Sequence, residues 1–230
     1  MSTNNDPNVS DALLNPVEAR LIGCLMEKQR TTPEQYPLTL NSLVSACNQK
    51  SARQPVMNLT AGEVGHAVNR LRDRGLIHVS LSGRTERFDH KLVGTFLLSR
   101  QEQALLCVLM LRGPQTLGEL RTNTARLAEF ADLAQVSDSL RGMATRDHAL
   151  IVELPRSPGK REERYAHLLC GQPQPDDCAR TDSRSESLSS GASKDSRIEA
   201  LESDVASLRA ELERLWELTG LADRRGDGRG

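Results

Sequence analysis

The chain has 230 residues, a formal net charge of −1 at pH 7 and 37% hydrophobic residues, so it is long enough for two small domains that each bury a core. Aromatic residues make up only 3%, and the cores must therefore be mainly Leu, Val, Ile and Ala. The near-zero net charge hides a local excess: residues 50–100 carry nine basic and four acidic residues, a net charge of +5. This excess suggests nucleic acid as a partner without deciding it.

The N-terminus and the cysteines indicate a cytoplasmic protein. Residues 1–10 are polar and lack the apolar core of a signal peptide, and no apolar run approaches the ~20 residues that a membrane helix needs. The five cysteines have irregular spacing and form no C-x-x-C pair, so neither a zinc ribbon nor a dithiol redox site is indicated. We therefore expect no membrane association.

Three helices and a hairpin are predicted first. Asn15, Pro16 and Glu18 are typical of a helix start, Thr39 begins a short second helix, and Thr60 with Glu63 forms a capping box for a third. The third helix has a buried stripe and ends at a glycine, and two strands at 76–81 and 86–90 follow around a turn at 82–84. This order predicts a winged helix-turn-helix domain.

The same pattern recurs in the second half of the chain. Residues Glu18 to Met26 have counterparts 84 positions later, from Glu102 to Met110, and Ser99 with Glu102 is again a capping box. Thr116 starts the second helix of this copy, and two strands at 151–154 and 164–168 close it. Its third helix is expected to bury Leu133, Val136, Leu140 and Met143. The recurrence indicates a duplicated domain, and we expect 16–91 and 97–169 each to enclose its own aliphatic core.

Past residue 170 the composition changes to Gly, Pro, Gln, Asp and Ser, which is typical of a flexible linker. A seven-residue repeat then predicts a parallel coiled-coil dimer, with a and d positions at Ile198, Leu201, Val205, Leu208, Leu212 and Leu215.

The fold class is therefore mainly α with small β-hairpins: two tandem winged helix-turn-helix domains and a C-terminal coiled-coil helix. The expected segments are a disordered N-terminus at 1–14, domain 1 at 15–95, domain 2 at 96–170, a linker at 171–193, a coiled-coil helix at 194–220 and a disordered tail at 221–230.

Several motifs resemble one known family. They are LNPVEAR at 14–20, YPLT at 36–39, ACNQKS at 46–51 and PVM at 55–57, then LRGPQT at 111–116, GELR at 118–121 and RYAHLL at 164–169. Together they are similar to the YceH-like bacterial proteins, a family called uncharacterised, over roughly residues 13–171. The resemblance implies a pair of winged-helix domains and no assigned biochemical activity.

The first domain offers the candidate nucleic-acid contacts. A winged helix usually lays its third helix in the major groove and its wing against the backbone. The candidates are His66, Asn69, Arg70, Arg72 and Arg74 on the third helix, with Arg84 and Arg87 on the wing. Asp73 in the middle of the exposed face and Glu63 near the helix start argue against DNA, and these arginines could equally form a solvated helix face.

The search for catalytic chemistry finds no motif. The five histidines are dispersed, and no H-E-x-x-H, G-x-S-x-G, P-loop or G-x-G-x-x-G pattern occurs, so we expect no enzyme, no cofactor and no metal site. The first reading is a dimeric protein, paired through residues 194–220, that binds double-stranded DNA as a transcription-related regulator. Two alternatives remain open: a protein-interaction scaffold that uses the tandem winged helices and the coiled coil, and a thiol sensor that uses Cys24, Cys47 or Cys107.

Overall fold

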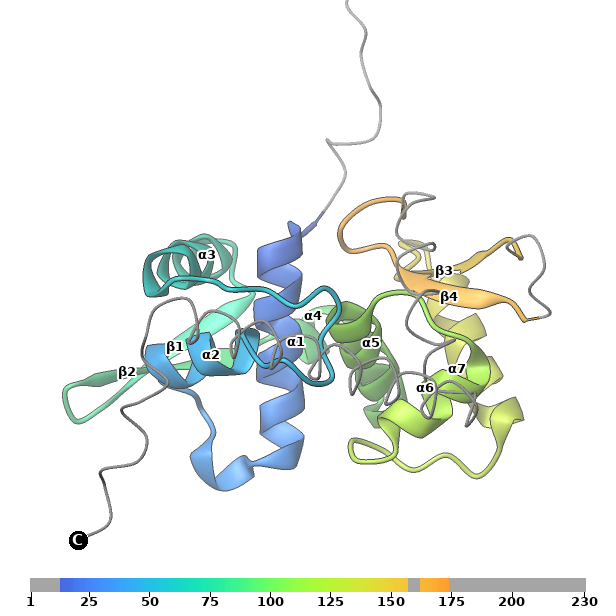
Figure 1. The fold of residues 1–230 in the computed structure, drawn as a ribbon, viewed down its shortest axis with the longest axis horizontal. Coiled ribbons are helices and arrows are strands. Elements are labelled where there is room, and N and C mark those ends of the chain that lie inside the picture. Colours follow the sequence, from blue (N-terminus) through green and yellow to red (C-terminus); the bar gives the residue numbers. More distant parts are fainter. Residues whose placement is uncertain (1–12, 157–161, 174–230) are drawn as a thin grey trace, which may run out of the picture. The chain divides into compact units, whose positions relative to one another are not determined.

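The computed structural model describes residues 13–156 and 162–173. The expected coiled-coil helix with all six of its a and d positions, the tail, and most of the linker lie outside the described residues. Within the described part the chain is mainly helical, with two small antiparallel hairpins (Figure 1). No helix in this part is both long enough and apolar enough to span a membrane.

The first half consists of three α-helices followed by a hairpin. Its elements are α1 (Pro16–Thr31), the 3-10 turn η1 (Pro33–Gln35), α2 (Leu40–Cys47), α3 (Ala61–Asp73), β1 (Ile77–Ser82) and β2 (Thr85–His90). The strands pair from Ile77 with His90 to Ser82 with Thr85, so Gly83 and Arg84 form a two-residue turn. Gly83 has a φ of 65°, which a side chain would strain and glycine adopts freely.

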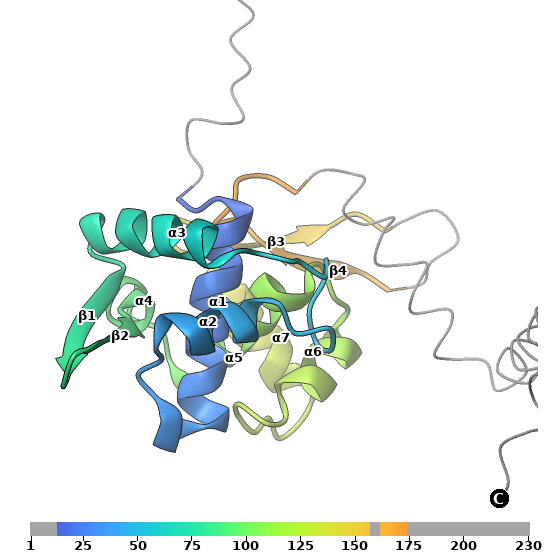
Figure 2. The same cartoon turned by 60° about the vertical axis from the view of Figure 1, so that its left-hand side comes forward.

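The second half repeats this order. A short helix, α4 (Leu92–Phe96), leads into α5 (Arg100–Arg112), α6 (Leu117–Thr124), α7 (Leu133–Ala144), β3 (Ile151–Leu154) and β4 (Arg164–His167). The sequence pattern did not predict α4. Figure 2 shows α6 and α7 at the end of the molecule away from the first hairpin.

Local capping determines where the helices begin. Capping boxes are formed at the start of α1, α3, α5 and α6, and each pairs a Ser, Thr or Asn cap with a glutamate three residues later. Each box satisfies backbone N–H groups that a helix start leaves free, and such a cap contributes ~1 kcal/mol. The predicted helix starts at Pro16, after Thr39 and after Thr60 are confirmed, as are those after Ser99 and Thr116.

The two halves share one hydrophobic core, and the expectation of two separate cores is wrong. Buried residues of both halves form a single cluster, in which α1 packs against α5. The helices approach closely at Gly23: a Cβ built there would lie 2.9 Å from Leu111 Cδ2, and the Cys107 thiol donates to the Gly23 carbonyl at 3.3 Å. Gly23 and Cys107 are 84 positions apart, so equivalent points of the two repeats meet at the crossing.

Burial on α1 and α5 explains why the cores merge. Every residue from Glu18 to Met26 is buried, and so is every residue from Gln103 to Leu111, so both helices are covered on all sides. One detail of the predicted stripe on α7 is also wrong: Leu133 is 44% exposed, because it is the first residue of the helix and lies before the part that packs on α5. Val136, Leu140 and Met143 are buried as expected.

Candidate nucleic-acid interface

The third helix of the first half presents a polar face to solvent, as the sequence predicts. Its buried stripe is Val64, Ala67, Val68 and Leu71. His66, Asn69, Arg70 and Asp73 are exposed on the opposite side, and Arg72 and Arg74 are exposed beside them. Within the described part of the chain, the side chains of His66 and Asn69 make no hydrogen bond to other residues. These two polar groups are therefore available to a partner.

Two of the candidate arginines are held by a buried glutamate. The Glu18 side chain is only 3% exposed and accepts from Arg70 Nε at 2.8 Å and from Arg74 Nη1 at 3.3 Å. The same carboxylate completes the capping box of α1 by accepting from the Asn15 backbone N–H. Arg74 also donates to the Leu13 carbonyl. Arg70 and Arg74 thus fasten α3 to the start of α1, although both guanidinium groups stay partly exposed.

The remaining candidate arginine of α3, Arg72, lies beside an acidic residue. Arg72 donates through Nε and Nη2 to Asp73 Oδ1, at 3.3 and 3.2 Å. Both side chains are about half or more exposed, and a pair of this kind contributes little to stability. Its main effect is to offset the positive charge of Arg72.

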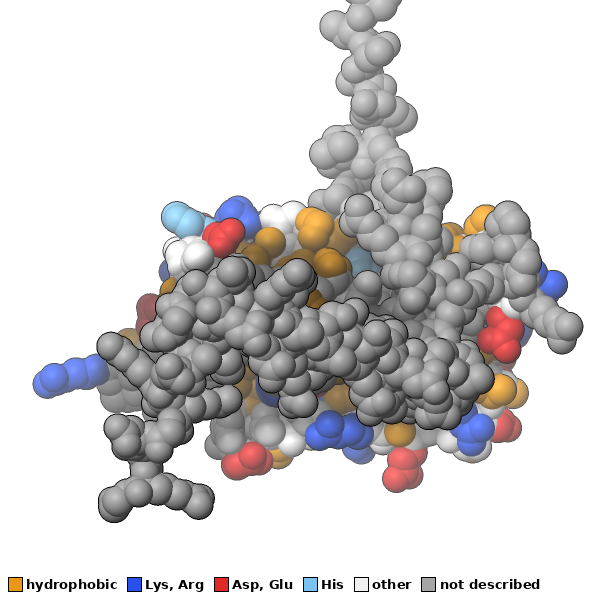
Figure 3. Space-filling view, viewed as in Figure 1, with side chains coloured by type: hydrophobic (Ala, Val, Ile, Leu, Met, Phe, Trp, Pro, Cys, Tyr) orange, Lys and Arg blue, Asp and Glu red, His pale blue; other side chains and the backbone are white. Residues whose placement is uncertain are grey.

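The hairpin places its two arginines differently. Arg84 lies in the exposed turn between β1 and β2, and Arg87 is half-buried on β2. Arg87 Nη1 donates to the Pro37 carbonyl at 2.8 Å, which ties the hairpin to the segment before α2. Figure 3 shows Lys or Arg atoms projecting at the tip of this hairpin, and side chains of both signs together with histidine over α3. Of the two, Arg84 is better placed to reach a phosphate.

In the first half, Glu18 with Arg70 and Arg74 forms a clamp between the start of the first helix and the end of the third, and the second half has an equivalent clamp. Glu102, the counterpart of Glu18, accepts from Arg146 Nη2 at 2.7 Å, and Arg146 also donates to the Phe96 carbonyl. Arg146 follows Met143 at the same distance as Arg74 follows Leu71. Both copies therefore join the end of the third helix to the start of the first. Sequence reasoning missed this pair, although aligning Glu18 with Glu102 and Arg74 with Arg146 in the two repeats would have shown it.

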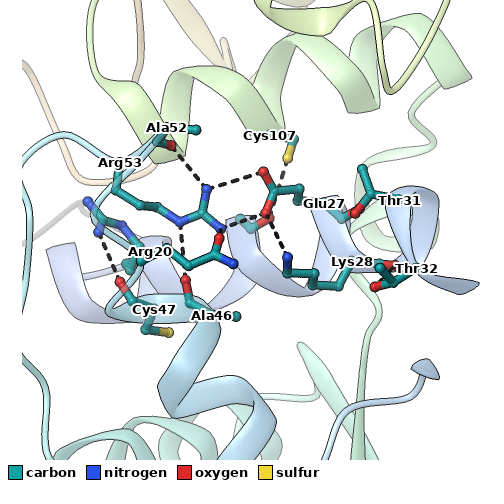
Figure 4. A network of polar contacts seen from close by, with 12 residues as sticks. Arg20, Glu27, Lys28, Thr31, Thr32, Ala46, Cys47, Ala52, Arg53 and Cys107 are labelled. Atoms are coloured by element: carbon teal, nitrogen blue, oxygen red, sulfur yellow. Dashed lines mark hydrogen bonds and ion pairs between the residues drawn. The ribbon is translucent and has the colours of Figure 1, made fainter.

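A separate polar network joins α1 to the end of α2 and to the loop between α2 and α3 (Figure 4). The Arg53 side chain is 0% exposed and forms an ion pair with Glu27, with Nη2 at 2.5 Å from Oε2. It also donates to the carbonyls of Ala46 and Ala52 and to Gln49 Oε1. Arg53 thereby fixes the loop between α2 and α3 onto α1. A buried charge of this kind needs its partner, since an isolated one is costly to desolvate.

Buried thiols surround the network. Cys24, Cys47 and Cys107 are at most 1% exposed. Burial raises the pKa of Cys107 well above its usual range, and the hydrogen bond with Cys24 raises that of Cys47. Cys47 and Cys107 therefore stay protonated at neutral pH. The pKa of Cys24 is lowered, because burial, which would raise it, is outweighed mainly by the hydrogen bond with Cys47. The Cys24 thiol is nevertheless 0% exposed, whereas a reactive cysteine needs both thiolate and access. These surroundings do not favour the thiol-sensor alternative.

Comparison with known proteins gives the family. The family described as "Protein of unknown function, DUF480" matches residues 14–160. The chain is 45% identical to a UPF0502 protein of Cellvibrio japonicus (strain Ueda107) over 209 residues, and 47% identical to one of Aliivibrio fischeri (strain MJ11) over 213. Each match covers 90% of this chain and 96% of the relative.

The chain belongs to this family of uncharacterised bacterial proteins. A UPF0502 protein of Stenotrophomonas maltophilia (strain K279a) is 47% identical over 209 residues, covering 88% of this chain and 94% of the relative. The resemblance to the YceH-like proteins is thereby confirmed. The matches reach beyond residue 173, so the UPF0502 relatives also share sequence with the part of the chain that the structure leaves undescribed. The family description names no activity, and function has to be argued from the site.

Proposed function

We propose that both halves of the chain are winged helices and that the first half binds double-stranded DNA through α3 and the hairpin β1–β2. The order of three helices and an antiparallel hairpin, found twice, supports the winged-helix assignment. The arrangement offers a helix for the major groove and a wing for the backbone. The chain acts without enzymatic chemistry and without a cofactor in this proposal.

One observation carries the DNA-binding part: α3 exposes polar side chains that make no hydrogen bond to any other residue described in the structure. Asn69 and His66 lie one turn apart on its outer face and can reach base edges, where an Asn amide matches the N6 and N7 atoms of adenine. Arg84 on the wing would contact phosphates, which positions the protein without selecting sequence. Arg72 would do so where a phosphate replaces Asp73 as its partner, because that pair is exposed and weak. Arg70 and Arg74 would contribute less, because Glu18 already offsets their charge.

The second half contributes less to such an interface. The exposed residues of α7 include the ion pair between Asp138 and Arg141, at 3.3 Å. Arg146, two residues after the end of α7, is held by Glu102, so this side of the second half has little positive bias. In the proposal, the segment from α5 to β4 packs against the first half and does not contact DNA. A homodimer paired through residues 194–220, which lie outside the described residues, would present two copies of α3 to one duplex.

Fluorescence anisotropy with a labelled random-sequence duplex over a salt series tests this proposal. We expect affinity to fall steeply as salt rises, because protein cations displace counterions from phosphates. Arg84→Ala should weaken binding to all sequences and reduce the salt slope by roughly one. Arg141→Ala on α7 is the matched control and should leave the slope unchanged. Absence of binding at low salt, binding that ignores salt, or equal effects of the two variants would contradict the proposal.

A protein-interaction scaffold is the second candidate, and the Glu18 clamp favours it. Glu18 and Asp73 offset the charge of three arginines of α3, which leaves a surface of mixed sign that suits a protein partner as well as DNA. Affinity capture from a nuclease-treated cell extract should then recover a protein in stoichiometric amount. Recovery of nucleic acid alone, from an untreated extract, would count against the scaffold.

A further inference from the structure

A cavity of ≈ 350 Å³ lies where the two halves meet. It is lined by α1, the loop between α2 and α3, the C-terminal end of α5, and β4 with the residues that follow it. Figure 3 shows hydrophobic side chains exposed over the middle of the face, between α3 and the second hairpin. The volume is within the range of sites that hold small organic molecules, roughly 300–1,000 Å³.

Arg20 lines this cavity, and its guanidinium has no carboxylate partner among the residues that the structure describes. Arg20 is 1% exposed, and it donates only to backbone carbonyls, from Nη1 to Cys47 at 3.2 Å and from Nη2 to Pro55 at 2.7 Å. Within the described part of the chain, its buried Nε has no hydrogen-bond partner and Arg20 forms no ion pair. Arg53 has the opposite surroundings, because Glu27 pairs with it. A buried arginine stays charged, so Arg20 leaves both a charge and a donor uncompensated.

A second orphaned polar group reaches the cavity from the other half. His167, at the end of β4, has a buried Nδ1 without a hydrogen-bond partner. Burial lowers the pKa of His167 to about 4, so the ring is neutral at pH 7 and can donate one hydrogen bond. The two unsatisfied groups therefore belong to different halves and line one space.

Most of the remaining lining is apolar. Ala19 of α1, Leu109 and Met110 of α5, Met57 of the loop and Ala166 of β4 all line the cavity. Ala166 is 4% exposed and is not part of the central core cluster, although it is buried. An apolar lining with a few convergent polar groups is the usual composition of a site for a small organic molecule.

We propose that this cavity binds a small organic monocarboxylate with an apolar body, whose carboxylate pairs with the Arg20 guanidinium and takes a further hydrogen bond from His167. A single uncompensated guanidinium calls for one negative charge, and the apolar lining suits a hydrocarbon chain or an aromatic ring. The bound molecule touches α1, the loop before α3, α5 and β4 at once, and it stabilises the folded chain by linkage. The inference is independent of DNA binding.

Isothermal titration calorimetry on the full-length protein tests the site with two acids and their neutral amides: octanoate and 2-naphthoate against octanamide and 2-naphthamide. We expect at least one acid to bind with one molecule per chain and to raise the melting temperature. Its amide, of the same shape, should bind at least tenfold more weakly, because it brings no charge to Arg20. Failure of both acids to bind, or equal binding of acid and amide, would overturn the proposal.

Substitutions test whether the acid binds in this cavity. Met57→Trp fills the cavity from the loop and should weaken binding of the acid at least tenfold, whereas Val56→Trp, at an exposed neighbour that does not line the cavity, should not. Arg20→Gln should remove the preference for acid over amide. If Arg20→Gln does not fold, as judged by circular dichroism, the two tryptophan variants decide the question. Equal effects of the tryptophan variants, or an unchanged preference in folded Arg20→Gln, would overturn the assignment.

Discussion

The first helices of the two halves occupy equivalent places in one core, yet they are built differently. α1 buries Glu18 and Arg20 and carries Glu27, whereas α5 has Ala104 and Leu111 at the positions 84 residues after Arg20 and Glu27. The polar helix is stable because distant segments supply its partners, whereas the more aliphatic helix buries one polar side chain in this stretch, Gln103, which hydrogen-bonds to Gln29 and Arg30 of α1. The same helical position therefore accepts either chemistry, provided that neighbouring segments satisfy every buried polar group.

The loops after the second helices show where those partners come from. In the first half, the chain between α2 and α3 supplies Arg53 to Glu27, and its Gln54 N–H donates to the Leu111 carbonyl of the other half at 2.8 Å. In the second half the corresponding connection between α6 and α7 is shorter. The long loop thus fastens the first half internally and also fastens it to the second.

The largest expected loss of stability comes from breaking the buried ion pair between Glu27 and Arg53. Glu27→Ala leaves Arg53 buried and unpaired, and it should lower the free energy of unfolding by about 3–5 kcal/mol, measured by urea denaturation. Glu163→Ala breaks the exposed pair with Arg156 in the second half and should cost at most about 1 kcal/mol. A loss below about 1 kcal/mol for Glu27→Ala would show that the polar core of the first half is dispensable.

Acid should destabilise both halves through one histidine each. His90 and His167 end the second strand of their hairpins, and burial lowers the pKa of each to about 4, below the ordinary value of ~6.5. The unfolded chain therefore binds more protons between these values, and stability should fall as pH decreases from about 6.5 to 4. Urea denaturation at several pH values should show a smaller slope in His90→Gln and in His167→Gln. An unchanged slope in both variants would contradict the account.

A substitution at the crossing of α1 and α5 should have a smaller effect on stability. Gly23→Ala places a methyl group against Leu111 in the shared core and should cost about 1–3 kcal/mol in thermal or urea unfolding. Gly65→Ala, on α3 where nothing lies within 4 Å, is the matched control and should stabilise by about 0.5–1 kcal/mol. If both substitutions stabilise the protein, α1 and α5 are not closely packed at Gly23.

The smallest effect concerns the two clamps and rests on the proposed function. Glu18→Gln removes the charge that offsets Arg70 and Arg74, and it should steepen the salt dependence of duplex binding by roughly one to two. Glu102→Gln alters the equivalent clamp in the second half and should leave that dependence unchanged. Equal responses in anisotropy titrations would mean that the halves do not differ in their contact with DNA.

Much of the local structure could be predicted from the sequence, because its causes are local. Caps such as Thr60 with Glu63 act within one turn, and the period of Val64, Val68 and Leu71 identifies the inner face of α3. The first hairpin follows from two short strands around Gly83. The outward placement of His66 and Asn69 followed from the same periodicity and is confirmed.

The shared core and the buried arginines could not be predicted in the same way. Arginine is usually exposed, and no local signal marks Arg20 on α1 or Arg53 in the loop before α3 as buried. Partners farther along the chain make their burial possible. One signal was present: the apolar run from Ala104 to Leu111 is too long for a helix with one buried face, and it indicates a helix covered on all sides. For Arg70 and Arg74, helical position correctly gave exposure but could not reveal Glu18 beneath them.

Chemical-shift mapping of the isotope-labelled protein titrated with a short duplex tests the central claim most directly, because it observes both halves at once. We expect the largest changes at the amides of α3 and of the turn between β1 and β2, and small changes along α7. Changes that concentrate on α7 and the second hairpin, or that are absent from α3, would contradict a DNA interface on the first half.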